Sequence, residues 1–195
     1  MSRPAPAPLT TARAVGCSAA AWCLFFAAVS AWQVVAGPAP GQRFAGYALG
    51  LAIMSVLVGV LKLAGAAVAL VAVLAPPGLP RRPLQLLGVA LWGAFGLLSL
   101  YSVGNLVITV GTVSGLLPPS AAWTAAGGVT VRAVLYVLFF LVGAALFGVL
   151  AVWFHRRHHL RWTSAVAGLG GAPMLLGLLL AVAPAILGQW GLLPT

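Results

Sequence analysis

The sequence lacks acidic residues altogether: its 195 residues include no aspartate and no glutamate. The ten basic residues are nine arginines and one lysine, Lys62, so charged residues make up only 5% of the chain. A soluble domain carries about 25% charged residues, and this chain cannot cover a water-facing surface in that way. The missing carboxylates also exclude proton relays through Asp or Glu and magnesium sites built from protein ligands.

Sequence patterns typical of catalytic sites or disulfide bonds are also scarce. Cys17 and Cys23 lie six residues apart in one apolar segment, so they fall on different faces of a helix and a disulfide is not expected. There is no nucleotide-binding loop and no nucleophile accompanied by a base and an orienting acid. The sequence therefore predicts that the protein is not an enzyme and needs no cofactor.

What the chain has instead is long apolar runs. Hydrophobic residues make up 63% of it, and the mean hydropathy is +1.13. The run from Leu49 to Pro76 exceeds the roughly 20 residues that a helix needs to cross a bilayer, with Lys62 in its middle. Inserting that lysine costs about 2.5 to 3.5 kcal/mol, which the surrounding Leu, Ile and Val residues offset at about 0.3 to 0.6 kcal/mol each.

Four similar runs predict an all-α fold, a polytopic transmembrane helical bundle of five spans, with four spans as the alternative. We expect the spans at about 14–36, 49–75, 84–112, 129–154 and 163–187, within a single domain covering 14–188. Residues 1–13 are expected to form a flexible cytoplasmic tail, and residues 189–195 a short external tail. Pro173, within the fifth run, predicts a kink.

The arginines predict the orientation. With a cytoplasmic N-terminus, seven arginines lie on the cytoplasmic side and two on the other, as the positive-inside rule requires. The seven are Arg3, Arg13, Arg81, Arg82, Arg156, Arg157 and Arg161, and the two are Arg43 and Arg132. We therefore expect a multi-pass protein of the cytoplasmic (cell) membrane, with the N-terminus inside and the C-terminus outside.

A few polar residues are candidates for function. Lys62 is the main one, because an ionisable side chain at mid-bilayer is a functional hypothesis by default. It is either neutral, solvated by polar groups, or paired with an anion or a partner's acid; the alternative is a structural lysine that snorkels to the headgroups. Tyr101, Asn105 and Arg132 join it as candidate polar residues of a cavity that attracts anions, although Arg132 is more easily explained as an interfacial anchor.

The short basic loops predict contact with lipid headgroups. The residues expected to contact anionic headgroups on the cytoplasmic side are Arg81, Arg82, Arg156, Arg157 and Arg161. Nucleic-acid binding is not expected, because the arginines form small clusters between apolar runs. His155, His158 and His159 have a spacing that suggests a metal site, but the arginines beside them oppose a cation, so no metal is expected.

Leu61-Lys62-Leu63, Leu79-Pro80-Arg81-Arg82 and the stretch Trp92 to Asn105 carry a family resemblance. Over about Ala21 to Arg157 the chain resembles small multi-pass actinobacterial membrane proteins, a family without an assigned function. The loop before the fourth apolar run departs from that pattern, because acidic residues are expected there and this chain has none. The resemblance implies four or five membrane helices and brings no activity with it.

These features predict a non-enzymatic integral membrane protein with a structural or accessory role, such as the partner subunit of another membrane protein or a homo-oligomer. The alternative is a small transporter or channel-like protein for an anion or a lipophilic solute, with Lys62 in its path.

Overall fold

The computed structural model describes residues 9–36, 48–76, 78–118 and 131–191. They form helices and their connections, and no strand occurs among them. The helices are α1 (Leu9–Ala36), α2 (Ala48–Leu74), α3 (Arg81–Val113), α5 (Val131–Arg157) and α6 (Trp162–Gly177), followed by the π-helix η2 (Leu178–Val182) and α7 (Ala183–Gln189). The expected all-α class is confirmed.

Four of these helices are long and apolar enough to cross a membrane. The qualifying segments are Thr10–Ala36, Ala48–Leu74, Arg81–Val113 and Val137–Arg157. Each contains more than the roughly 20 residues that a ~30 Å hydrocarbon core requires. The described residues therefore have the structure expected of a helical membrane protein.

The last apolar run differs from the single helix expected over 163–187. Residues Trp162 to Gln189 are helical throughout, but they divide into α6, the π-helical turn η2 and α7. Pro173 lies inside α6 and has no N–H to donate to the preceding turn, and Pro184 is in the first turn of α7. Helix α6 continues through Pro173 to Gly177, so the division of the run coincides with Pro184, just after the π-helical turn.

The first and third helices begin earlier than expected. The helix α1 starts at Leu9, so residues 9–13 belong to it and not to the predicted tail. Pro8 precedes this start, and proline is well tolerated at the beginning of a helix. In α3 the helix starts at Arg81, and Pro83 occupies its first turn, where proline is well tolerated.

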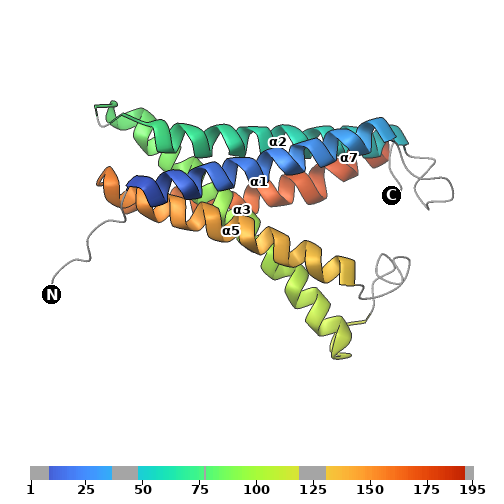
Figure 1. The fold of residues 1–195 in the computed structure, drawn as a ribbon. Coiled ribbons are helices and arrows are strands. Elements are labelled where there is room, and N and C mark those ends of the chain that lie inside the picture. The colour runs from blue at the N-terminus through green and yellow to red at the C-terminus, as the bar shows by residue number, and fades with distance from the viewer. Residues whose placement is uncertain (1–8, 37–47, 77, 119–130, 192–195) are drawn as a thin grey trace.

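The helices pack in a definite order. Helix α1 packs against α2 and α5, while α3 packs against α5 and α6, so that α3 and α1 are joined mainly through α5. Figure 1 shows α1 and α2 running side by side, whereas α3 crosses behind them and its last turns diverge from them together with the start of α5. Fully buried large side chains at the centre are Phe147, Phe154, Leu91 and Leu150.

Glycines permit the closest helix contacts. A Cβ atom added at Gly168 of α6 would lie 2.5 Å from the Val89 carbonyl oxygen and 2.9 Å from the Gly93 nitrogen, both in the backbone of α3. At Gly143 of α5 a Cβ would meet the Trp22 ring at 2.6 Å. The first contact fixes α6 on α3, and the second seats the Trp22 indole on α5.

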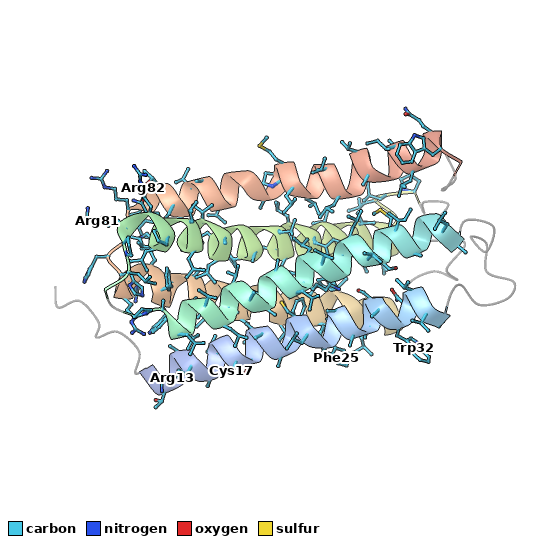
Figure 2. All side chains as sticks on the ribbon, turned by 90° about the horizontal axis from the view of Figure 1, so that it is seen from above. Arg13, Cys17, Phe25, Trp32, Arg81 and Arg82 are labelled. Atoms are coloured by element: carbon cyan, nitrogen blue, oxygen red, sulfur yellow. The ribbon has the colours of Figure 1, made fainter. Side chains whose placement is uncertain are left out.

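The basic residues gather at one end of the bundle. Figure 2 shows Arg13, Arg81 and Arg82 at one end and Trp32 near the opposite end. The end of α5, at Arg157, and the connection to α6, which carries Arg161, lie at the same end as the start of α1 (Figure 1). Arg3 and Arg43 lie outside the described residues.

Candidate functional site

The site is built around Lys62, halfway along α2. Twelve residues separate Lys62 from Leu74, which corresponds to about 18 Å of helix. Fourteen residues separate it from Ala48 at the other end. An amine held at this position is far from both ends of a helix that is otherwise almost entirely apolar.

The Lys62 ammonium group lies over aromatic rings. Its Nζ atom is 4.0 Å from the centroid of the Phe26 ring of α1 and 5.5 Å from the centroid of the Phe140 ring of α5. Among the described residues we find no hydrogen bond or ion pair to Nζ. The cation is therefore stabilised by the negative faces of two aromatic rings from neighbouring helices.

The two ring contacts offset much of the cost of the charge. A cation–π contact contributes about 0.5 to 1 kcal/mol when exposed and about 2 kcal/mol when desolvated. A lysine at mid-membrane costs about 2.5 to 3.5 kcal/mol on the insertion scale. Because the chain contains no Asp or Glu, any side-chain carboxylate that neutralises Lys62 must come from outside the chain.

An aromatic cluster holds these rings in place. The Trp22 indole stacks on Phe139 with the ring centroids 5.6 Å apart, and its Nε1–H donates a 3.1 Å hydrogen bond to the Phe139 carbonyl oxygen. Phe26 lies 4.8 Å from Phe139 and 5.2 Å from Phe140 between centroids. The cluster joins α1 to α5 and fixes the position of the cation–π contact.

Tyr101 of α3 reaches the same cluster. Its ring centroid is 4.9 Å from that of Phe140, so Tyr101 and Lys62 both lie against one phenyl ring. Both residues are candidates from the sequence, and both contact the Phe140 ring. The sequence could not indicate Phe140 as their common contact, since it lies 78 residues beyond Lys62.

Beside Lys62 the helices line a half-open cavity of about 540 Å³, which we call the Lys62 cavity. Its walls come from α1, α2, α3, α5, α6 and η2, and they are formed almost entirely by apolar side chains. The polar side chains in its lining are those of Lys62, Tyr101, Cys23 and Trp22, and the Trp22 N–H is already used. The volume falls within the range of about 300 to 1,000 Å³ typical of small-molecule sites.

Asn105 does not line this cavity. Asn105 uses its side-chain N–H to bond the Tyr101 carbonyl oxygen at 2.7 Å, which is a contact within α3. Arg132 belongs to the first turn of α5, and its side chain lies outside the described residues. The described contacts therefore bring Lys62 and Tyr101 to the same ring, whereas the Asn105 amide bonds within its own helix.

Cys17 and Cys23 are both free thiols. Cys17 is exposed and Cys23 is buried in the lining of the Lys62 cavity. Gly65, one helical turn beyond Lys62, makes room for the thiol, because an added Cβ would lie 3.2 Å from the Cys23 sulfur. This close approach draws α1 and α2 together next to the cavity.

The arginine-rich end holds the histidines in separate surroundings. His155 packs against Trp162 with the ring centroids 4.6 Å apart, and His158 packs against Phe154 at 4.5 Å. Arg157 lies over the Trp153 ring at 4.9 Å. Within the described residues no group of three His, Cys, Asp or Glu side chains is arranged to hold a metal ion.

Burial changes the acidity of one histidine of this loop. The pKa of His158 is lowered from its ordinary value because burial disfavours the charged imidazolium, and the positive charges of Arg157 and His159 add to the effect. His158 therefore stays neutral to a lower pH than a free histidine.

The sequence alone missed the aromatic cluster and the cavity. Two local signals existed, namely the rings at Trp22, Phe25 and Phe26 and the Phe139-Phe140 pair, each near the middle of an apolar run. Comparisons with known proteins add nothing to the geometry. The resemblance based on Lys62 and the Tyr101–Asn105 stretch stays a prediction, because no protein-family model matches the chain and no curated protein or solved structure matches it.

Proposed function

We propose that the protein is a non-enzymatic integral membrane protein that binds a lipophilic anion within the bilayer, with Lys62 holding the negative group. The observation that carries this proposal is a cationic side chain in the wall of an apolar cavity, in a chain without acidic side chains. Binding and release of such an anion is the chemistry of a small transporter or carrier. Tyr101, next to the same ring as Lys62, supplies a hydroxyl donor.

The topology proposed with this function has five membrane crossings, the N-terminus in the cytoplasm and the C-terminus outside the cell membrane. The collection of Arg13, Arg81, Arg82 and the α5–α6 connection at one end supports this orientation through the positive-inside rule. Residues Trp162 to Gln189, about 42 Å of helix, are long enough for the fifth crossing.

Tags accessible to impermeant reagents test the topology. A tag at the N-terminus and one in the α5–α6 connection should react only after the cells are permeabilised, and a C-terminal tag should react in intact cells. A C-terminal tag that is protected in intact cells would contradict the five-span arrangement.

Binding of lipophilic anions to the protein in lipid nanodiscs tests the function. We would compare palmitate, hexadecanesulfonate and tetraphenylborate, with empty nanodiscs as the blank. Losing a charge-assisted hydrogen bond, roughly 1.5 to 3 kcal/mol, should weaken binding of at least one anion about tenfold or more in Lys62→Met. Lys62→Arg should retain much of the binding.

Arg81→Met is the matched control, because it removes the same charge from the exposed basic end and leaves the cavity unchanged. It should bind the anions as the unmodified protein does. Equal binding by the Lys62→Met and unmodified proteins for every anion would rule out the proposed function.

An accessory subunit is the second candidate. Lys62 is only partly buried in the described chain, so a carboxylate on a helix of a partner membrane protein is an alternative counter-charge. In that case an acidic membrane protein should copurify with the unmodified protein and be lost from Lys62→Met. Copurification that is unchanged by this substitution would argue against pairing through Lys62.

A further inference from the structure

The Lys62 cavity is elongated along the helices. On α2 its lining extends from Met54 to Val68, and on α3 from Val89 to Tyr101. At 1.5 Å per residue these stretches correspond to roughly 18 to 21 Å. A site of this length, parallel to the membrane helices, suits a linear chain better than a compact molecule.

The cavity lies between two helices that do not pack closely on each other. Helix α2 packs on α1, and α6 packs on α3; in the described residues α2 and α6 share no extensive contact, yet both line the cavity. Figure 2 shows α6 and α7 along one side of the molecule and α1 along the other, with α2 and α3 between them. A ligand can therefore enter sideways from the lipid, between α2 and α6, with α3 behind it.

The wall formed by α3 and α6 is made of small residues where the two helices meet. Gly93 on α3 and Gly168, Gly171 and Ala172 on α6 line the cavity. A Cβ atom added at Gly171 would meet nothing within 4 Å, so the cavity is open at that position. This surface is smooth and without polar side chains, as a hydrocarbon chain requires.

The polar side chains of the cavity define where the charged head of the ligand lies. Tyr101 is at one end of the α3 stretch, and Lys62 lies within the α2 stretch. Lys62 and Tyr101 offer ammonium and hydroxyl donors near one phenyl ring, and two donors match the two oxygens of a carboxylate. A phospholipid headgroup contains further polar groups, and each would lose about 1 to 3 kcal/mol if buried here without a partner. A single carboxylate is the anionic group that this lining satisfies.

We infer that the ligand of the Lys62 cavity is a long-chain carboxylate, a free fatty acid, which enters from the lipid between α2 and α6 and places its carboxylate at Lys62 and Tyr101. This inference rests on the proposed function and narrows its ligand from lipophilic anions in general to one class.

Filling the cavity at Gly171 tests the inference. Gly171→Leu places an isobutyl group in the open space of the cavity, and palmitate binding in nanodiscs should weaken at least tenfold. Gly170→Leu is the matched control: Gly170 also has nothing within 4 Å of an added Cβ, but it does not line the cavity. It should bind palmitate as the unmodified protein does. Equal affinity of the two variants would overturn the inference.

A second measurement uses the unmodified protein and does not depend on the folding of a variant. Palmitic acid with a diazirine at its far end, activated by light, should label α2, α3 and α6 residues that line the cavity. Excess palmitate should suppress that labelling. Labelling confined to lipid-facing residues outside the cavity, such as Val166 and Met174, would overturn the inference.

Comparing palmitate, hexadecanesulfonate and tetraphenylborate distinguishes failure of the fatty-acid inference from failure of the proposed function. If tetraphenylborate or hexadecanesulfonate binds in a Lys62-dependent way and palmitate does not, the fatty-acid inference fails and the proposed function stands. If none of the anions depends on Lys62, both fail.

Discussion

Lys62 has a charge in an unfavourable position that two aromatic rings compensate. The contacts with Phe26 and Phe140 contribute about 0.5 to 2 kcal/mol each, while the insertion cost is about 2.5 to 3.5 kcal/mol. The two terms are of similar size, so the charge adds little net stability to the unliganded protein.

The substitution Lys62→Met should therefore leave the unliganded protein as stable as before or raise its stability by about 1 kcal/mol, because methionine fills similar volume without a charge. Thermal unfolding in detergent micelles measures this. Lys62→Arg keeps the charge and serves as the control. A loss of more than about 2 kcal/mol in the methionine variant would show that the ammonium group is a structural element of the empty protein.

His158 should make stability depend on pH. Its pKa in the folded protein is lowered from the ordinary value of about 6.5, so the unfolded chain binds a proton more readily. Its contribution to stability is complete above pH 6.5 and is lost as the pH falls toward the folded pKa. The drop in melting temperature between pH 7.5 and 5.5 should be smaller in His158→Gln, and an identical drop would contradict the prediction.

At the scale of the element, the α5–α6 connection contains a residue, His159, whose backbone lies in the left-handed region of φ and ψ. His159 has φ of 46°, and the Leu160 N–H donates to the His155 carbonyl oxygen at 3.2 Å, the pattern of a Schellman helix end. Glycine adopts this conformation without the steric cost of a Cβ atom. The histidine at this position thus carries strain that glycine would relieve.

His159→Gly is expected to stabilise the protein by about 0.5 to 1 kcal/mol. His159→Ala removes the imidazole and keeps the strain, so it should give no such gain. Thermal unfolding of the two variants at pH 7.5 provides the comparison. Equal stability of both would show that the backbone conformation is not the cause.

The contact between α3 and α6 depends on Gly168. A methyl group there would meet backbone atoms of α3 at 2.5 and 2.9 Å, and backbone cannot rotate away as a side chain can. Gly168→Ala should therefore separate the helices and cost about 1 to 3 kcal/mol, measured as a lower melting temperature. Gly170→Ala, which points into open space, should be neutral or stabilising. A neutral Gly168→Ala would mean that α6 readily shifts on α3.

At the scale of the whole molecule, positive charge is concentrated at one end. Arg156 and Arg161 are exposed there, and no acidic side chain exists to neutralise them. Anionic lipids should therefore stabilise the protein by about 1 kcal/mol for each arginine near the surface. The combined Arg156→Gln and Arg161→Gln variant should lose about 2 kcal/mol of that stabilisation, measured as a smaller difference in melting temperature between anionic and zwitterionic nanodiscs. High salt should reduce that difference in the unmodified protein.

The helices themselves could be predicted from the sequence, because apolar runs of sufficient length have few other structures open to them in a membrane. Their packing order could not. In a soluble protein the apolar stripe of a helix marks its buried face, but here the lipid-facing side is as apolar as the core. Leu63 of α2 is half-exposed and Ala66 is buried, and no difference in polarity separates them. The aromatic cluster and the gap between α2 and α6 follow from that packing, so they could not be predicted from the sequence.

A site that opens to lipid draws its ligand from the bilayer, where amphiphiles are far more concentrated than in water. Occupancy of the Lys62 cavity would then depend on the fraction of ligand in the surrounding bilayer and not on its concentration in water. Purification matters for the same reason: a surfactant with a straight tail and a carboxylate head, such as lauroylsarcosine, would compete for Lys62, whereas a maltoside would leave it vacant.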